Sequence, residues 1–176
     1  MWVGLEQVRD RPFRWDETEA VDAAEIGHAD VQAIGPVRWR GEIRFVDPGF
    51  LLTAKISYQQ TLGCQRCLEP LAQQVEEDVQ LLLVPGAAMP ASPEHALEAE
   101  ELGLVEVPED GELELRPLLI EQIQLNVPMK PLCREGCAGL CPTCGANLNE
   151  GACGCQTEEI DPRWEGLKAF QERKKV

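Results

Sequence analysis

Six of the chain's eight cysteines lie within the segment Pro131–Cys155. All eight fall into pairs whose members are two to four positions apart. The pairs are Cys64/Cys67, Cys133/Cys137, Cys141/Cys144 and Cys153/Cys155. Two sulfurs so close in sequence can both reach one tetrahedral metal ion, at about 2.3 Å from each sulfur. Four such pairs therefore predict two metal sites, each with four thiolate ligands.

The rest of the sequence favours metal binding over disulfides. The N-terminal stretch MWVGLEQVRDRPFRWDE lacks the basic start and apolar block of a signal peptide, and no apolar run is long enough for a membrane helix. We therefore expect a cytoplasmic protein, in which thiols stay reduced. Zinc is the expected metal, as two structural ions, because four thiolates leave no open position for water or substrate. An iron–sulfur cluster, unliganded thiols and disulfides are the alternatives.

Which cysteine pairs share an ion is a separate question. The loop GANLNEGA, between the last two pairs, is long enough to fold back, so we expect one ion at Cys141, Cys144, Cys153 and Cys155. The second ion then takes the first two pairs. The alternative joins the two C-x-x-C turns, Cys64/Cys67 with Cys141/Cys144, as in a zinc ribbon. Within CPTCG, Gly145 is expected to reverse the chain with a positive φ, and backbone amides there can donate to the sulfurs.

Alternation of apolar and polar residues predicts an antiparallel sheet. In VRWRGEIRF, residues 37–45, Arg38, Arg40 and Arg44 alternate with apolar positions, which indicates a strand with a basic outer face. A Pro-Gly turn leads to a second strand over residues 51–60. Residues 71–84 predict a third strand, entered through Cys64 and Cys67. The connections are too short for crossover helices, so a meander is the natural arrangement.

Short helices and loops account for the remaining residues. RPLLIEQIQLNVP predicts a helix with Pro117 in its first turn and with Leu118, Ile120, Ile123 and Leu125 as a rough apolar stripe. Residues 104–115 predict a small hairpin. A C-terminal helix is expected from Asp161, which is a suitable N-cap. The residues Trp164, Leu167 and Phe170 share one face of that helix.

The predicted fold class is α+β, an antiparallel sheet meander with a few short helices and a cysteine-rich zinc-binding segment. Residues 1–29 are expected to form an irregular segment that begins with a short strand or turn and contains one helical turn. The sheet domain is expected at residues 30–130, with an acidic loop at 85–111. The cysteine-rich segment and the C-terminal helix, residues 131–176, are expected to pack on the same domain.

The net charge of −15 is unevenly distributed. Thirteen of the 31 acidic residues lie between Cys67 and Leu115, where no Lys or Arg occurs. This stretch is interpreted either as a solvated, partly flexible face or as a docking surface for a basic partner. The sequence shows no phosphate-binding glycine loop, nucleophile elbow or paired His/Asp set. We therefore predict that the protein is not an enzyme and binds neither a small-molecule substrate nor a membrane.

Three stretches in order also carry a family resemblance: CQRCLEP, then LLIEQIQLNVPMKPLCREGCAGLCPTCGANLNEGACGC, then DPRWEGLKAF. Together they resemble the YceD family, the large ribosomal RNA subunit accumulation proteins, over roughly residues 30–172. The resemblance implies a bacterial cytoplasmic protein needed for accumulation of 23S ribosomal RNA. By position, the eight cysteines and Arg66 match the family, which offers no catalytic residues to transfer.

Two kinds of function follow from these observations. An assembly factor would contact 23S ribosomal RNA or the pre-ribosomal large subunit, directly or indirectly, with Arg38, Arg40, Arg44 and Arg66 as candidate phosphate contacts. Ordinary surface arginines are the plainer interpretation. A protein-binding factor would instead use the acidic stretch to shield a basic ribosomal protein, with Glu98, Glu100 and Glu101 as candidate contacts. A transcription-type zinc ribbon is a more distant third alternative.

Overall fold

The computed structural model describes residues 1–85, 104–108 and 110–155. These residues belong to two compact units. Of the described residues, the first unit comprises those within Met1–Gln65 and Glu69–Cys133, and the second comprises Arg66–Leu68 and residues 134–155. The predicted C-terminal helix and most of the predicted acidic loop lie outside the described residues. Within the described ranges, no helix has the length and apolar character needed to cross a membrane.

A six-stranded sheet forms the frame of the first unit. Its main path runs in the order β2-β4-β5-β6-β7, and β3 pairs with β5 off this path. A separate two-stranded sheet pairs β1 with β8. The strands are β1 (Trp2–Gly4), β2 (Phe13–Glu19), β3 (Val31–Ile34), β4 (Val37–Val46), β5 (Gly49–Gly63), β6 (Pro70–Pro85), β7 (Leu104–Val107) and β8 (Glu112–Glu114). The helices are α1 (Leu5–Val8), α2 (Ala23–Ile26) and α3 (Leu115–Leu125).

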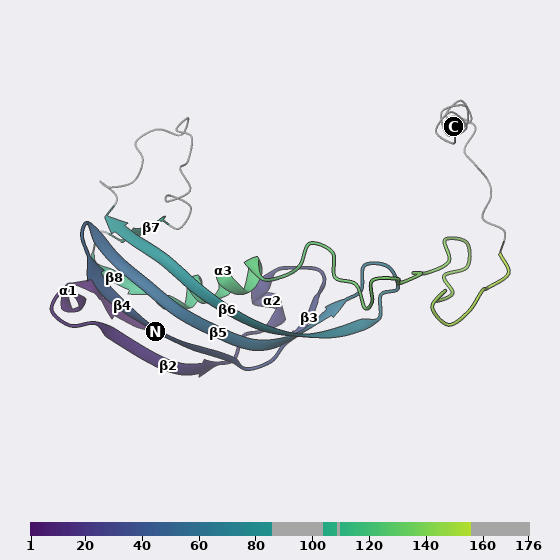
Figure 1. Cartoon of the computed structure of the whole chain (residues 1–176), viewed down its shortest axis with the longest axis horizontal. Helices are drawn as coiled ribbons and strands as arrows, with labels where there is room; N and C mark the ends of the chain where they lie inside the picture. Colours follow the sequence, from purple (N-terminus) through teal and green to yellow (C-terminus); the bar gives the residue numbers. More distant parts are fainter. Residues whose placement is uncertain (86–103, 109, 156–176) are drawn as a thin grey trace, which may run out of the picture. The chain divides into compact units, whose positions relative to one another are not determined.

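The three central strands form the antiparallel meander that the sequence predicts (Figure 1). The long pair β5 and β6 stays in register from Phe50, opposite Leu83, to Gly63, opposite Pro70. Alternation then places one face of each strand in the core, so that Trp39, Ile43 and Ile56 are almost fully buried. The sheet is therefore mostly antiparallel, with few and short helices around it.

Three local predictions are wrong. Residues 104–115 do not form a hairpin, because β7 pairs with β6 in parallel and β8 pairs with β1 at the N-terminus. Within residues 1–29, the short first strand and a helical turn are present as β1 and α2, but the part predicted to be irregular contains β2, which adds seven residues to the edge of the main sheet. On α3, Leu125 is 71% exposed, whereas Leu119, outside the predicted stripe, is buried. The first two differences arise from pairing between distant segments, which a local pattern does not contain.

Helix α3 packs into the core beside the sheet. Leu115, Leu119 and Ile123 belong to the same buried cluster as the central strands. Arg116 on this helix donates to Glu19 of β2 at 2.6 Å and to Glu25 of α2 at 2.9 Å. The Asp22 backbone N–H and the Arg116 guanidinium both donate to Glu25, and together they lower the pKa of that carboxyl. Arg116 thus connects three elements of the first unit.

Tyr58, the chain's single tyrosine, gives a direct test of this core. Its side chain is buried, and burial together with the negative charge of Glu77 raises the pKa of the phenol to about 12. An unfolded chain loses this proton near pH 10. Folding stability is therefore complete below about pH 10 and falls as the pH rises toward 12. An alkaline titration that follows tyrosinate absorbance should show that Tyr58 loses its proton at a higher pH in the folded chain than in the denatured chain. A midpoint equal to that of the denatured chain would contradict the burial of Tyr58.

Candidate metal centres

The structure brings the eight cysteines together in two groups of four. Within each group, the four sulfur atoms lie within 4.8 Å of one another. Tetrahedral ligation at about 2.3 Å places sulfur atoms roughly 3.8 Å apart, so both groups match the size of a four-thiolate site. The first cluster is Cys64, Cys67, Cys133 and Cys137, and the second cluster is Cys141, Cys144, Cys153 and Cys155. This grouping is the one that the sequence favoured over the ribbon arrangement.

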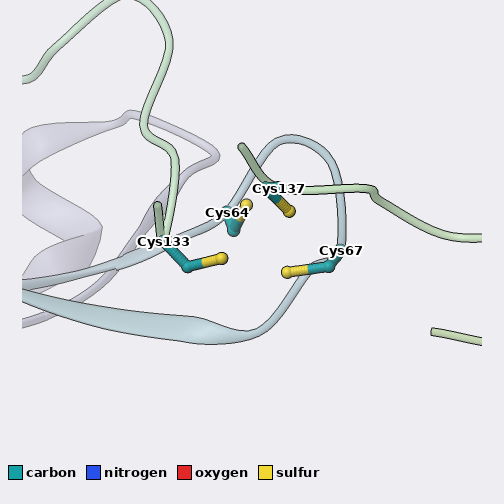
Figure 2. A group of neighbouring side chains, drawn as sticks. All are labelled: Cys64, Cys67, Cys133 and Cys137. Atoms are coloured by element: carbon teal, nitrogen blue, oxygen red, sulfur yellow. The ribbon is translucent and has the colours of Figure 1, made fainter. Parts of the chain in front are cut away.

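Figure 2 shows the four sulfurs of the first cluster pointing toward a common centre. Such convergence suits a single ion. A four-iron cluster holds its cysteine sulfurs farther apart, because the iron atoms lie between them. The cysteine pairs come from the turn between β5 and β6 and from the segment that follows α3. Three of these four cysteines, all except Cys133, are buried.

Backbone hydrogen bonds fix Cys64 beside the segment that carries Cys133. The Cys64 N–H donates to the Glu69 carbonyl at 2.9 Å, which closes the turn after β5. The next residue, Gln65, donates its N–H to the Pro131 carbonyl, also at 2.9 Å. The Gln65 side chain adds a hydrogen bond to the Met129 carbonyl at 3.1 Å. Two hydrogen bonds of Gln65 therefore link these segments, which are distant in sequence.

Arg66 holds the other side of the same turn. Its guanidinium donates to the Cys137 carbonyl at 2.7 Å, and its own carbonyl accepts from the Leu140 N–H at 3.0 Å. Gly139, at φ +79°, lies so close that a Cβ there would be 3.1 Å from the Arg66 carbonyl oxygen. The observed role of Arg66 is thus to position the cysteine segment. Its predicted contact with RNA stays a prediction.

The second cluster is built around the turn CPTCG. Gly145 reverses the chain at φ +74°, as the sequence predicts, and its N–H donates to the Cys141 carbonyl at 2.8 Å. The Cys141 N–H in turn donates to the Ala146 carbonyl at 2.8 Å. Backbone N–H groups of Cys144 and Thr143 point at the Cys141 sulfur and lower the pKa of its thiol to about 6. The turn thus stabilises one thiolate before any cation arrives.

The last cysteine of the cluster behaves in the opposite way. The neighbouring sulfurs of Cys144 and Cys153 raise the pKa of the Cys155 thiol to about 12. Four thiolates in this volume repel one another, because like charges at close range disfavour ionisation. A divalent cation removes this conflict, and binding then releases the remaining protons. The donor set and the spacing of both clusters therefore fit a tetrahedral, thiolate-preferring metal.

Asn149 is a functional candidate that the sequence did not reveal. It lies in the loop between Cys144 and Cys153, and its side-chain N–H donates to the Cys137 sulfur at 3.3 Å. The loop is rich in Asn and Gly, a composition typical of any turn. No spacing or periodicity singles out one asparagine as a partner of a sulfur, so only the folded geometry identifies it.

The predicted basic face is present on β4, but nearby acids compensate it. Arg38, Arg40 and Arg44 are all exposed on the side of the strand away from the core. Arg38 makes two hydrogen bonds to Asp16 of β2, at 3.0 and 2.8 Å, and the guanidinium lowers the pKa of that carboxyl. The neighbouring Arg14 pairs with Glu42 at 2.8 Å. Among the described residues, Arg40 and Arg44 form no ion pair.

A shallow hollow lies beside these arginines. It has a volume of about 170 Å³, and its lining residues are Arg38, Arg40, Lys55, Ser57 and Glu76. Arg40 and Lys55 stand directly opposite each other on β4 and β5. Like charges at such a position destabilise a sheet, and Asp78 of β6, which pairs with Lys55 at 3.7 Å, offsets part of this repulsion. The other predicted contacts, Glu98, Glu100 and Glu101, lie outside the described residues.

The fold and the clusters define a mainly antiparallel β-sheet protein with two four-cysteine groups. A family model described as large ribosomal RNA subunit accumulation protein YceD matches residues 52–171. The chain therefore belongs to the YceD family. No solved structure matches this chain.

Relatives place the chain among bacterial and plant proteins. An uncharacterized protein of Mycobacterium bovis is 35% identical over 126 residues, which cover 71% of this chain and 57% of the relative. The chain thus spans a little over half the length of the mycobacterial relatives that it matches. A Bacillus subtilis protein, uncharacterized YlbN, is 24% identical over 93% of this chain and 91% of its own length. The chloroplastic YCED homolog 1 of Zea mays, named a large ribosomal RNA subunit accumulation protein, is 27% identical over 57% of this chain and 42% of its own length.

Proposed function

We propose that this protein is a non-enzymatic, zinc-binding factor that supports accumulation of 23S ribosomal RNA and assembly of the large ribosomal subunit in the bacterial cytoplasm. Membership of the YceD family is the observation that carries this proposal. The printed names of the Zea mays and Arabidopsis thaliana relatives point to the same role in those plants. The two clusters support a structural use of metal, since four thiolates leave no coordination position for a substrate.

In this proposal the metal ions shape the cysteine-rich segment and take no part in chemistry. Each cluster binds one zinc ion through its four sulfurs. A structural zinc of this kind stabilises its fold by about 10–16 kcal/mol at neutral pH. Such an amount exceeds the whole stability of a typical small domain, so the loops around the clusters depend on their ions.

The proposed RNA contact is the exposed face of β4 with the hollow beside it. Arg40 and Arg44 are the strongest candidates, because their charges are not used in ion pairs among the described residues. Lys55 and Ser57 add a second cation and a hydroxyl at the same hollow. Few phosphate contacts and a net charge of −15 make this contact weak and sensitive to salt. Shape or a protein partner would then supply most of the specificity.

Deletion of the gene tests the main proposal. We expect large-subunit ribosomal RNA to fall relative to small-subunit RNA, because the family role concerns the large subunit alone. Sucrose-gradient sedimentation and quantification of the two RNAs measure this, with the restored gene as the control. A deletion strain with a normal sedimentation profile would count against the proposal.

A second candidate function is shielding of a basic ribosomal protein before it joins the subunit. The observation that favours it is the run of thirteen acidic residues without a single Lys or Arg between Cys67 and Leu115. Opposite charge accelerates encounter most at low salt. Under this candidate, changing Glu98, Glu100 and Glu101 to Gln slows the capture of basic ribosomal proteins.

Salt-dependent binding separates the two candidates. Neutralising Arg40 and Arg44 with Gln should weaken binding to 23S fragments and reduce the slope of log affinity against log salt by about 0.7–0.9 per lost phosphate contact. The matched control is Arg38→Gln, since Asp16 already uses that charge, and its effect should be smaller. One outcome favours the shielding function over direct RNA contact. In it, the variant with Gln at Arg40 and Arg44 binds RNA as the parent does, while the variant with Gln at Glu98, Glu100 and Glu101 loses its protein partner.

A further inference from the structure

We propose that Asn149 couples the two metal clusters, so that an ion in the second cluster raises the affinity of the first. In this role Asn149 is a positioning residue that acts on Cys137, a member of the first cluster. The inference rests on the proposed metal binding. It adds that the two sites do not fill independently.

The side chain of Asn149 touches the first cluster directly. Its Nδ2 donates to the Cys137 sulfur at 3.3 Å and to Asn147 Oδ1 at 2.9 Å. Its Oδ1 accepts from the Ala138 N–H at 2.8 Å and from the Arg134 guanidinium at 2.6 Å. Both oxygen partners are pure donors, which fixes the amide orientation and leaves the N–H₂ group facing the sulfur. One side chain thereby contacts the Cys137 sulfur, the backbone N–H that follows it and the Arg134 side chain before it.

The position of Asn149 depends on the loop of the second cluster. Cys144 precedes that loop and Cys153 follows it, so one ion bound to both cysteines closes the loop around Asn149. Within the loop, the Leu148 N–H donates to the Gly139 carbonyl at 2.8 Å, and Leu140 forms a bridge with Asn147. These bonds place Asn149 next to Cys137 only while the loop keeps its conformation.

Outside the cluster, this loop is ordered by a small set of hydrogen bonds and has no regular secondary structure of its own. It is rich in Gly and Asn, and it contributes only a single isolated bridge to the secondary structure of the described chain. Without an ion at Cys141, Cys144, Cys153 and Cys155, its backbone entropy favours open conformations. The amide of Asn149 would then leave the Cys137 sulfur for part of the time, and the first cluster would lose that donor.

The donor matters because a tetrathiolate site carries excess negative charge. An N–H directed at a metal-bound sulfur disperses part of that charge and so stabilises the occupied site. Loss of such an outer partner typically lowers metal affinity 10–100-fold. We therefore expect the filled second cluster to raise the affinity of the first by a factor in this range. By reciprocity, the filled first cluster raises the affinity of the second equally.

Asn149→Asp is the sharpest variant. The substitution keeps the size of the side chain and the oxygen that accepts from Ala138 and Arg134. It replaces the donor with a second oxygen that repels the sulfur. Titration of the metal-free full chain with Co²⁺ under reducing conditions gives the affinity of each cluster, because cobalt bound to thiolates absorbs in the visible range. We expect the first-cluster affinity for Co²⁺ to fall at least 10-fold.

To test the coupling itself, Asn149→Asp must also be made in a chain whose second cluster cannot bind metal. In a chain with Cys153→Ser and Cys155→Ser, the second cluster cannot close its loop, so the first cluster should already bind Co²⁺ 10–100-fold more weakly. Adding Asn149→Asp to that chain should then change little. Equal losses in both backgrounds, or no loss in either, would overturn the coupling.

Two controls exclude a general loss of folding. Asn126→Asp makes the same chemical change on α3, where the amide donates to the Gln122 carbonyl, and it should leave both Co²⁺ affinities unchanged. Glu150→Gln alters the charge of the Asn149 loop without touching a sulfur, and it should also leave them unchanged. If the parent chain binds no Co²⁺ at all, both the metal proposal and the coupling are wrong. If the parent binds two ions with no effect of Asn149→Asp, only the coupling is wrong.

Discussion

Replacement of Cys141 with Ser should reduce the zinc content of the purified protein from about two ions to about one per chain. Cys141 is the buried member of the second cluster that the backbone prepares as a thiolate. Serine offers a hydroxyl that stays protonated and binds zinc poorly, so three thiolates remain where four are needed. The first cluster should keep its ion, because a 10–100-fold coupling is small beside a structural zinc affinity of about 10–16 kcal/mol.

Elemental analysis of the purified variant and parent measures this directly and distinguishes zinc from iron. Thr143→Ser is the matched control, since it lies in the same turn and supplies no ligand, and it should retain both ions. A parent without metal would contradict the proposal for both clusters. Loss of both ions from the Cys141→Ser protein would instead indicate a coupling between the two clusters far stronger than 10–100-fold.

Gly41→Ala should strongly destabilise the sheet. Gly41 lies on β4 opposite Ala54 of β5. A Cβ at Gly41 would be 2.4 Å from the Thr53 carbonyl oxygen and 2.8 Å from the Ala54 Cβ. Both atoms belong to a central strand that pairs on each side, so neither can move away without breaking the ladder. Overpacking of this kind lowers the free energy of unfolding by about 1–3 kcal/mol. Because this clash involves the backbone, we expect a decrease near or above the upper end of that range.

Denaturant unfolding followed by tryptophan fluorescence reports this change, because Trp15 and Trp39 are both buried in the core of the sheet. Gly136→Ala is the control, since no atom lies within 4 Å of the Cβ position and the backbone conformation there suits any residue. An unfolding midpoint for Gly41→Ala equal to that of the parent would show that β4 and β5 separate more readily than their register implies.

Local patterns account for the parts of the fold that could be predicted. The alternation over β4 and β5 identifies the strands and their buried faces, because side chains in a strand point to opposite sides in turn. Pro117 and the turn glycine Gly145 also act locally, and both occupy the predicted places. The division of the cysteines into two clusters follows from the short loop between Cys144 and Cys153, which is again a local property.

Pairing between distant segments accounts for what could not be predicted. The pairing of β1 with β8 joins the N-terminus to residues near 113, and no short window contains both. The basic face of β4 was predicted correctly as a set of exposed arginines. The pairing of Arg38 with Asp16 was not predicted, because Asp16 lies on β2 and its position beside Arg38 depends on strand order and register. The contact between Asn149 and Cys137 was not predicted for the same reason, since the two residues come together only in the folded chain.

If the proposed RNA contact is made, the mixture of charges on the outer side of the sheet also affects the rate at which RNA binds. Acids and bases lie close together there, as in the series Asp16, Arg40, Lys55 and Asp78 across four strands. The electric fields of these neighbouring charges cancel one another at the distance of a Debye length, about 8–10 Å. At that distance only the net charge of −15 acts on a partner. An approaching RNA is therefore repelled until it touches. Added salt should speed its arrival by screening that repulsion and should also shorten its stay by competing for the phosphates.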